Sequence, residues 1–403
     1  MPVKKMKIHF LGIGGIGVSA LARYYLAKGH IVSGSDFASS EITESLKKDG
    51  AKISVGKNII PKDVDLIIYS PAVTVEHRMS NMLSYPEALG QLTKEYFTIA
   101  VSGTHGKTTT TAMLALILIK AGFDPTVVIG TKLKEFDNTN FRMGKSKYLL
   151  IEADEHFASF LNYWPQVLAI INIEADHLDF YKNFENIKKA FDKFISHLPE
   201  DGILITEKST NKKEFLKIKK ILKVPGDHNA HNASIALATA RAMKIPDKIS
   251  FKALSQYKGV WRRFEIIKTK PFILISDYGH NPQKALATLK AAREKYPKKI
   301  IWCVYQPHQY ERTYFLFDDF VNAFRKAPID HLIITDIFDV AGRENKQTKQ
   351  KVDSQKLVKA VNKSIVSYLP KDKIVAYLKK EVRNGEVVII MGAGDIYKID
   401  NDL

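Results

Sequence analysis

Cysteine is almost absent from the chain: Cys303 is the only one in 403 residues. A lone cysteine cannot form an intramolecular disulfide, which excludes a disulfide-stapled secreted domain and fits a reducing compartment. The chain also lacks a run of about 18 apolar residues, the length that a membrane-spanning helix needs. The N-terminus is basic and then apolar, but it has no small-residue cleavage site and contains several glycines. We therefore expect a first strand there and not a signal peptide.

Acidic residues are outnumbered: 61 Lys and Arg stand against 43 Asp and Glu, a formal net charge of +18. Such an excess raises the possibility of nucleic-acid binding. However, most of it is lysine scattered along expected helix faces, such as Lys213, Lys217 and Lys220. We also find no RNA-recognition motif, zinc finger or basic arm, so we expect no nucleic-acid partner. A basic surface would instead attract anionic, phosphorylated substrates.

Short apolar, β-branched runs alternate with helical stretches along the whole chain, which predicts an α/β fold with mostly parallel sheets. The predicted strands lie at 7–11, 31–35, 66–70, 98–102, 148–152, 167–173, 203–206, 272–276, 300–305, 332–335 and 387–391. The predicted helices include 18–28, 109–121, 232–243 and 282–295. Breaks near 91–96 and 260–270 divide the chain into three units, 1–96, 97–265 and 266–403.

A glycine-rich turn follows the first predicted strand, at Gly12–Gly17, and a helix follows the turn. Glycines at this spacing let backbone amides approach a diphosphate at the helix N-terminus. The next strand ends at Ser35 and Asp36, where a carboxylate would meet a ribose hydroxyl. The pattern selects a diphosphate and not a nicotinamide, so binding of NAD stays an open but weaker interpretation.

A second glycine loop, Gly103–Thr109, connects the strand at 98–102 to an apolar helix and is a shortened Walker A motif. Its backbone amides would hold phosphates, Lys107 would reach the β- and γ-phosphates, and the Thr108 hydroxyl would ligate Mg²⁺. Two later strands end in Glu152 and, a little further on, His177. Because the carboxyl ends of parallel strands meet at one edge, these residues are expected to join Thr108 around a metal.

The blocks HFLGIGGIGVSALA, VSGTHGKTTTTAM, EADEHFASFL, NIEADHLDFY, PGDHNAHNASIALA, GVWRRFE, DYGHNP, QPHQYERT and MGAGDIYKI occur in order along nearly the whole chain. This set resembles the Mur ligases of peptidoglycan synthesis, and most of all their alanine-adding branch. The resemblance implies a Rossmann-like N-terminal domain for a UDP-sugar, a P-loop ATPase-like central domain for ATP, and a Rossmann-like C-terminal domain for an amino acid.

The resemblance also implies roles for individual residues of this chain. The UDP-sugar would contact Gly12, Gly14, Gly15, Gly17, Ser35, Asp36 and Ser70. ATP would contact Gly103, Thr104, His105, Gly106, Lys107, Thr108, Thr109, His228, Asn229, Arg263 and Asp277. Mg²⁺ would be held by Thr108, Glu152 and His177, and the amino acid by Tyr278, His280, His308 and Arg312. The catalytic residues would be Lys107, Glu152, His177 and His280. Without the resemblance, Arg263 and its neighbour Arg262 would be interpreted as a basic linker.

The implied activity is ATP-dependent joining of L-alanine to the lactyl carboxylate of UDP-N-acetylmuramate through an acyl phosphate. We accordingly expect a cytoplasmic enzyme with small-molecule substrates, no membrane partner, and a monomeric or weakly dimeric state. Three features depart from the pattern. Gln309 stands where the alanine-adding branch usually has arginine, and Asn281 where it often has a second histidine. Only about 20 lysine-rich residues separate the strand at 203–206 from 224–226, which predicts a trimmed central domain that retains its ATP site.

Alternatives remain open. A ligase of cell-wall recycling that attaches a peptide is disfavoured by Gln306-Pro307-His308 and Arg312, which resemble the alanine-adding pattern. A ligase for another acceptor amino acid is kept open by Gln309. A non-catalytic homologue is opposed by the intact candidate residues of the phosphate and metal sites. An NAD-dependent oxidoreductase and a nucleic-acid-stimulated ATPase are more remote.

Overall fold

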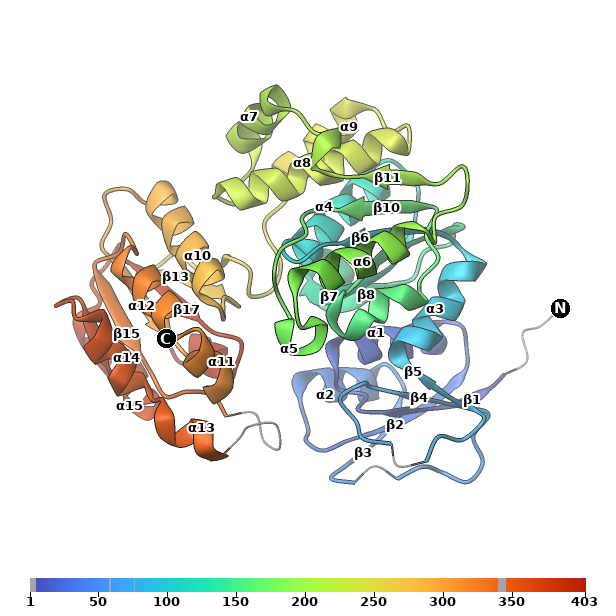
Figure 1. The fold of residues 1–403 in the computed structure, drawn as a ribbon, viewed down its shortest axis with the longest axis horizontal. Helices are drawn as coiled ribbons and strands as arrows, with labels where there is room; N and C mark the ends of the chain where they lie inside the picture. The colour runs from blue at the N-terminus through green and yellow to red at the C-terminus, as the bar shows by residue number, and fades with distance from the viewer. Residues whose placement is uncertain (1–4, 58, 76, 340–345) are drawn as a thin grey trace. The chain divides into compact units, whose positions relative to one another are not determined.

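The computed structural model describes residues 5–57, 59–75, 77–339 and 346–403, which form three β-sheets flanked by helices (Figure 1). Their contacts divide the chain into two compact units. The first comprises the chain up to Ile221 together with His231–Tyr257, and the second comprises Leu222–Ala230 together with Lys258–Leu403. The predicted α/β class with three parallel-rich regions is confirmed. The predicted boundaries at residues 96 and 265 stay predictions, because contacts group the first two sheets in one unit.

The first sheet has the order β3-β2-β1-β4-β5, with every neighbouring pair parallel. Its elements are β1 (Lys7–Leu11), α1 (Ile16–Ala27), β2 (Ile31–Asp36), α2 (Glu41–Lys48), β3 (Lys52–Val55), β4 (Leu66–Tyr69), β5 (Met82–Ser84) and α3 (Tyr85–Glu95). The order reverses between β1 and β4, and ligands of open parallel sheets bind at the carboxyl ends of strands at such a point. Gly12 directly follows β1 and Ser70 directly follows β4, so the predicted sugar-nucleotide residues flank this point.

The second sheet has the order β11-β10-β6-β9-β7-β8, parallel except for the β7–β8 pair. Its strands are β6 (Phe97–Ser102), β7 (Thr126–Leu133), β8 (Thr139–Arg142), β9 (Tyr148–Glu152), β10 (Val167–Ile170) and β11 (Ile203–Ile205). Its helices are α4 (Lys107–Lys120), η1 (Lys134–Phe136), η2 (His156–Asn162), α5 (Leu178–Tyr181), α6 (Phe184–Ile195), η3 (Glu207–Ser209), α7 (Lys212–Ile221), α8 (Asp227–Ala242) and α9 (Asp247–Gln256). Between β11 and β12 the described residues form helices and no strand.

One continuous hydrophobic core joins these two sheets. It runs from Phe10 and Leu21 of the first sheet and its helix to Phe160 and Phe191 beside the second. Burying each such side chain stabilises the fold by about 1.5–3 kcal/mol. Because this core is shared, the two sheets belong to one compact unit. The β7–β8 hairpin packs on α1 at the same interface (Figure 1).

A buried asparagine fixes this hairpin to the first turn of α1. The Asn140 amide nitrogen donates to the Ile16 carbonyl and to Ser19 Oγ, 3.0 Å away. The Arg23 guanidinium donates to Asn140 Oδ1 at 2.8 Å. Because α1 begins at the glycine turn, these bonds hold that turn in a set position relative to the second sheet.

The third sheet has the order β12-β13-β17-β14-β15-β16, parallel except for the β12–β13 pair. Its strands are β12 (Glu265–Lys268), β13 (Ile273–Asp277), β14 (Ile301–Tyr305), β15 (His331–Ile334), β16 (Val366–Tyr368) and β17 (Val387–Met391). Its helices are α10 (Pro282–Lys295), α11 (Tyr310–Phe315), α12 (Phe317–Arg325), α13 (Lys346–Lys351), α14 (Ser354–Val361), α15 (Lys371–Glu381) and η4 (Ile396–Asn401). Separate apolar clusters cover its two faces, and Cys303 is buried within β14.

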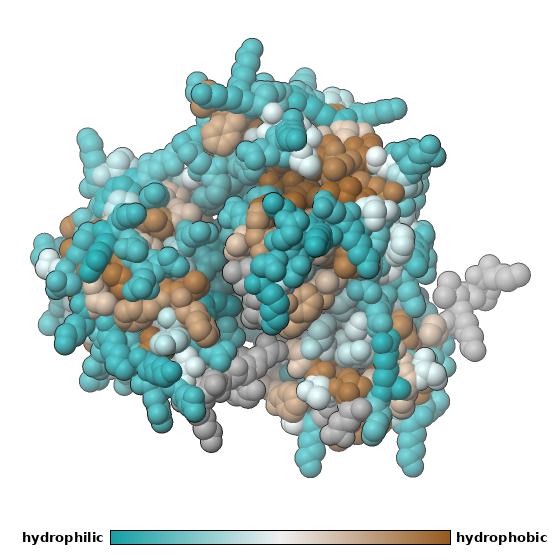
Figure 2. Space-filling model, viewed as in Figure 1, coloured by the Kyte–Doolittle hydropathy of each residue, from teal (hydrophilic) through white to brown (hydrophobic). Residues whose placement is uncertain are grey.

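Hydrophilic side chains cover most of the face in Figure 2. In the lysine-rich helix α7, only Ile218 is buried. None of the described helices has the length and apolar character needed to cross a membrane.

Candidate active site

The first glycine turn is closed by bonds to the end of β2. The amides of Gly12 and Ile13 donate to the Ser35 carbonyl at 2.9 and 3.1 Å. The Gly14 amide donates to Asp36 Oδ2 at 2.8 Å, so the carboxylate predicted to meet a ribose also supports the turn. Gly12 has a φ of +73°, and a Cβ there would lie 3.0 Å from the Cβ of Ser70. The predicted residues Gly12, Gly14, Ser35, Asp36 and Ser70 are therefore brought together at the carboxyl edge of the sheet.

The last glycine of this turn has a different neighbour. A Cβ on Gly17 would lie 2.8 Å from the ring of Tyr85, at the start of α3. A substitution at Gly17 would therefore displace the aromatic ring that lies against the first turn of α1. Gly15 closes the turn from within, because its amide donates to the Gly12 carbonyl at 3.1 Å.

The phosphate loop between β6 and α4 is pinned to the chain that follows β10. The Thr104 amide donates to the Asn172 carbonyl at 3.1 Å, and the His105 amide donates to Asn172 Oδ1 at 2.8 Å. Gly103 and Gly106 have φ values of +134° and +86°, which other residues rarely adopt. The N-cap residue of α4 is Gly106, which has no side chain to cap the first amides of the helix. A helix N-terminus of this kind, with the loop amides around it, favours an anion such as phosphate.

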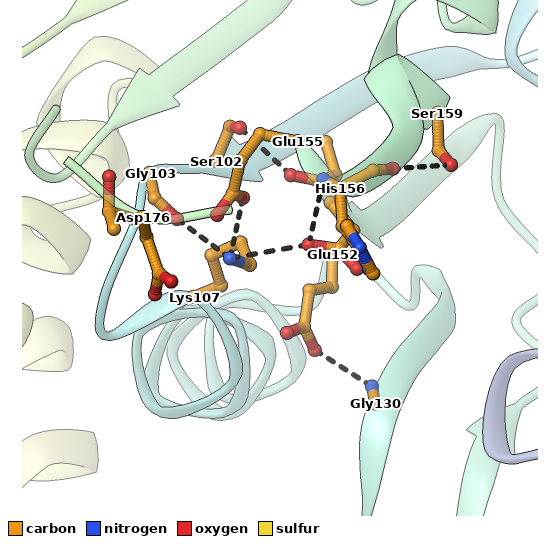
Figure 3. Close-up of polar contacts among 12 residues, drawn as sticks. Ser102, Gly103, Lys107, Gly130, Glu152, Glu155, His156, Ser159 and Asp176 are labelled. Atoms are coloured by element: carbon orange, nitrogen blue, oxygen red, sulfur yellow. Dashed lines mark hydrogen bonds and ion pairs between the residues drawn. The ribbon is translucent and has the colours of Figure 1, made fainter. Parts of the chain in front are cut away.

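Lys107, at the first turn of α4, lies among three oxygen acceptors (Figure 3). Its ammonium donates to Glu155 Oε2 at 2.6 Å and to the Gly103 carbonyl at 2.8 Å, and Asp154 Oδ1 lies 3.4 Å away. The Glu155 side chain is only 3% exposed. Burial by itself lowers the pKa of Lys107, but Glu155 and Asp154 outweigh it, so the net pKa is raised and the lysine stays charged. These contacts fix the charged ammonium of Lys107 beside the phosphate loop.

Glu152, at the end of β9, is positioned from both sides. Its Oε1 accepts from Thr108 Oγ1 at 2.7 Å. Its Oε2 accepts from the Gly130 amide at 2.8 Å (Figure 3). A carboxylate and a hydroxyl are the oxygen donors that Mg²⁺ prefers, so Thr108 and Glu152 fit that ion. Among the described residues there is no group of three or more His, Cys, Asp and Glu with metal-ligating spacing. The two oxygens alone would leave most of the coordination to water and phosphate, as is usual for Mg²⁺.

His177 lies beside Glu155 and is not in the hydrogen-bonded pair of Thr108 and Glu152. Its Nε2 is 3.7 Å from Glu155 Oε1, and its ring stacks on His156 with centroids 4.1 Å apart. Burial lowers the pKa of His177, which favours the neutral imidazole that a metal requires. The residue has a φ of +52°. Sequence reasoning therefore placed His177 near the phosphate loop, but its contacts are with Glu155 and His156.

The residues predicted for ATP outside the phosphate loop all belong to the second unit. His228 and Asn229 lie in the first turn of α8, which begins at Asp227 and so five residues before the predicted start at residue 232. Gly226, with a φ of +97°, allows the chain to enter the helix early. The Asn229 side chain donates to the Pro225 carbonyl at 2.6 Å.

Asp277 and the two arginines pack within the second unit as well. Asp277 accepts from the amides of Phe264 and Gly279, at 2.8 and 2.7 Å, so both carboxylate oxygens already have backbone partners. Arg263 lies over the Tyr278 ring, 4.9 Å from its centroid. Arg262 is only 4% exposed and donates to the Gly392 carbonyl. A solvated basic linker is therefore not what these arginines form.

The predicted amino-acid residues form one cluster at the ends of β13 and β14. The rings of Tyr278 and His280 are 5.2 Å apart, and those of His280 and His308 are 6.3 Å apart. Arg312 Nη1 lies 3.0 Å from His308 Nδ1. Burial, with Arg312 adding to it, lowers the pKa of His308 to about 4, and burial lowers the pKa of His280 well below its ordinary value. Two neutral imidazoles thus stand beside a fixed cation. Gln309, which lies between His308 and Arg312 in sequence, has a φ of +71°.

Comparison with known proteins places this arrangement in a family. Three family models match: the "Mur ligase family, catalytic domain" at residues 7–97, the "Mur ligase middle domain" at 101–223, and the "Mur ligase, glutamate ligase domain" at 262–394. A UDP-N-acetylmuramate–L-alanine ligase of Acetivibrio thermocellus is 39% identical over 99% of this chain and 95% of its own length. The chain belongs to the Mur ligase family. The resemblance seen in its motifs is confirmed.

Other relatives agree at the level of sequence and of fold. A UDP-N-acetylmuramate–L-alanine ligase of Clostridium acetobutylicum is 39% identical over 98% of this chain and 96% of its own length. The crystal structure of a UDP-N-acetylmuramate–alanine ligase from Thermotoga maritima matches with a TM-score of 0.81 and 26% identity, covering 98% of both chains. A murein peptide ligase from Psychrobacter arcticus matches with a TM-score of 0.70 over 99% of this chain and 98% of its own, but at 23% identity it shows the Mur ligase fold alone.

Three residues that contact the candidate site residues escaped sequence reasoning. Gly130 holds Glu152 through its backbone amide, Asn172 pins the phosphate loop, and Glu155 pairs with Lys107. The hairpin that carries Gly130 turns at Asp137 and Asn138, residue types typical of turns, but no strand was predicted on either side of them. Glu155 and Asn172 follow the ends of strands β9 and β10 by three and two residues, so these positions were the available signal.

Proposed function

We propose that this Mur ligase joins L-alanine to the lactyl carboxylate of UDP-N-acetylmuramate with hydrolysis of ATP to ADP and phosphate. The observation that carries the proposal is the identity of 36–39% to alanine ligases over nearly the full length of the chain. The arrangement of Lys107, Thr108 and Glu152 supports the phosphoryl-transfer half of the reaction. A free carboxylate is a poor acyl donor, and phosphorylation supplies the leaving group.

The reaction proceeds in two steps. A carboxylate oxygen attacks the γ-phosphate, the bond to ADP breaks, and an acyl phosphate forms. The alanine nitrogen then attacks the acyl carbon, a tetrahedral intermediate forms, and phosphate leaves as the amide is made. Lys107 stabilises the negative charge that develops on the phosphoryl oxygens, and the loop amides fix their position.

Mg²⁺ would be held by Thr108 and Glu152, with His177 as a further ligand, and would supply charge stabilisation on the phosphate oxygens. The chain's own contribution at this point is orientation. The Gly130 amide fixes one oxygen of Glu152 and directs the other toward Thr108.

The residues expected to bind the amino acid all belong to the second unit. The Arg312 guanidinium suits the alanine carboxylate, because it can donate two parallel hydrogen bonds to it. His280 and His308 are neutral at pH 7, since burial lowers the pKa of both, and a neutral imidazole can accept the proton that the attacking amine loses. The use of ATP and a UDP-sugar supports a cytoplasmic location.

The proposal is tested by phosphate release from ATP and Mg²⁺ with UDP-N-acetylmuramate and a panel of acceptors. Release that needs both the sugar nucleotide and L-alanine is the expected result. Release with glycine or serine in place of L-alanine would show that the ligase uses a different acceptor amino acid, and would point to Gln309 as the cause. Release that needs the sugar nucleotide and a tripeptide, in place of L-alanine, would indicate a peptide-attaching ligase. No release with any acceptor would contradict the proposed activity.

A further inference from the structure

Two large aromatic side chains lie exposed beside the candidate metal and phosphate residues. Phe157 is 56% exposed and Phe180 is 39% exposed, and their rings meet edge to face with centroids 5.4 Å apart. The His156 ring stacks on Phe157 at 4.0 Å and on His177 at 4.1 Å, so it lies between them. We call His156, Phe157 and Phe180 the aromatic shelf.

The shelf is linked to the reacting centre by a short series of contacts. His177, at the base of the stack, lies 3.7 Å from one oxygen of Glu155. The other oxygen of Glu155 accepts from Lys107 at 2.6 Å. All these residues belong to the first compact unit. The shelf is therefore a near neighbour of the lysine that is expected to contact the γ-phosphate.

The backbone beneath the shelf is strained. Phe157 and the following Ala158 have φ values of 53° and ψ values of 26° and 28°, in the left-handed region. A bulky side chain is an outlier there, because its Cβ approaches the carbonyl oxygen closely. The turn is held by bonds from the Ala158 amide to Glu155 at 2.9 Å and from the Phe160 amide to Asp154 at 3.0 Å.

Burial does not compensate for this strain, because most of the Phe157 side chain faces solvent. A single exposed aromatic residue needs no explanation. An exposed aromatic residue on a strained turn beside a reacting centre does, since strain of this kind is typical of positions that contact ligands. The turn presents the ring outward, where a bound molecule can cover it.

We propose that the aromatic shelf binds the C–H face of the muramyl pyranose ring, an inference that rests on the proposed function. Only an ether oxygen and one carbon separate that ring from the carboxylate that attacks the γ-phosphate. The ring must therefore lie close to Lys107, as the shelf does. The face of an aromatic ring carries a negative quadrupole that attracts the polarised C–H groups of a sugar. Adenine fits less well, because two phosphates and a ribose separate it from the γ-phosphate.

The test compares two ligands and three variants by calorimetry and thermal unfolding. In Phe157→Asn, the new residue tolerates left-handed backbone, so the melting temperature should stay equal or rise. Its Kd for UDP-N-acetylmuramate should rise about tenfold, a loss in the range of an aromatic contact. Its Kd for UDP, which lacks the sugar, should stay within about twofold. Phe157→Tyr should retain the affinity of the unaltered protein for both ligands.

Trp164→Ala is the matched control. Trp164 is 41% exposed and stacks on His197 at 4.3 Å, but it precedes β10 and so lies at the opposite edge of the same sheet. It should change neither affinity. Equal affinity of Phe157→Asn for the sugar nucleotide, equal weakening for both ligands, or a lower melting temperature would overturn the shelf proposal. So would a KM increase confined to L-alanine, which would indicate contact with the amino-acid side.

The two proposals fail separately. A chain that binds UDP-N-acetylmuramate but releases no phosphate contradicts the proposed ligase activity, while the ratio of variant to unaltered affinity still tests the shelf. A chain that binds UDP but shows no gain in affinity from the sugar overturns the shelf and leaves the phosphate-release result to decide the activity.

Discussion

Lys107 donates to Glu155 at 2.6 Å, and this buried ion pair sits where phosphate oxygens are expected to bind. Asp154 and the Gly103 carbonyl complete the surroundings of the ammonium. Nucleotide must therefore compete with protein carboxylates for the lysine. The pair links a residue of the phosphate loop to the acidic segment after β9, and several expected outcomes follow from it.

Lys107→Ala should lower kcat on the order of 10³-fold, because one charge-stabilising group of the transferring phosphoryl is lost. The measurement is phosphate release at saturating substrates. The variant also leaves Glu155 buried without its partner, so a double variant with Glu155→Gln serves as the control. Turnover should stay low in the double variant even where folding is normal. Unchanged turnover in Lys107→Ala would show that the lysine does not stabilise the transferring phosphoryl group.

Glu155→Gln should lower the Kd for ADP about fivefold at pH 8. Burial raises the pKa of Glu155 to about 7, so at pH 8 the carboxylate is mostly ionised and the substitution removes one negative charge beside Lys107. Calorimetry in the absence of Mg²⁺ measures this. Glu174→Gln is the control: it removes the same charge 3.7 Å from His105 on the phosphate loop, but its side chain is half exposed. Weaker binding of ADP by Glu155→Gln would mean that the glutamate assists the lysine and does not compete for it.

Gly130→Ala should raise the Mg²⁺ concentration needed for half-maximal activity about tenfold. A Cβ at residue 130 would lie 2.7 Å from Glu152 Oε2, so it would displace the carboxylate that fits the ion. Loss of a group that orients a metal ligand typically costs 10–100-fold in affinity. Excess Mg²⁺ should restore activity in this variant but not in Glu152→Gln. An unchanged Mg²⁺ dependence would show that Gly130 does not position a ligand of the metal.

Asp400→Asn should stabilise the protein at alkaline pH. Burial raises the pKa of Asp400 from 3.8 to about 7. The folded state therefore holds its proton more tightly than the unfolded state, and stability falls as pH rises through this interval. Removing the charge should raise the free energy of unfolding by about 2 kcal/mol at pH 8, with a smaller gain near pH 4.

Denaturant unfolding at both pH values measures this difference. Asp402→Asn, which changes an exposed aspartate two residues away, is the control and should show no such dependence on pH. A gain in Asp400→Asn that is equal at pH 4 and pH 8 would show that the ionised carboxylate is not the cause.

Much of the fold follows from local patterns of the sequence. The strands at Lys7–Leu11, Tyr148–Glu152 and Val387–Met391 were predicted to the residue, because apolar runs of this length between glycines and polar residues have few other uses. The β7–β8 hairpin was missed although Asp137 and Asn138, with φ values of +52° and +58°, are residue types typical of turns. Its second strand, Thr139–Arg142, contains no apolar run from which a strand could be predicted. The start of α8 was placed too late, because the glycine before it was not taken as a helix boundary.

The sequence by itself determined the family, and with it the reaction class, because its ordered motif blocks resemble the Mur ligases. Its two glycine loops predicted a diphosphate site and a phosphate loop from local geometry. Only the tertiary structure decided that Gly130 holds Glu152, that Asn140 fixes the hairpin to α1, and that His177 stacks on His156 beside Glu155. The physical reason is sequence separation: such contacts depend on how strands pair and helices pack, and no short pattern encodes which distant side chains meet.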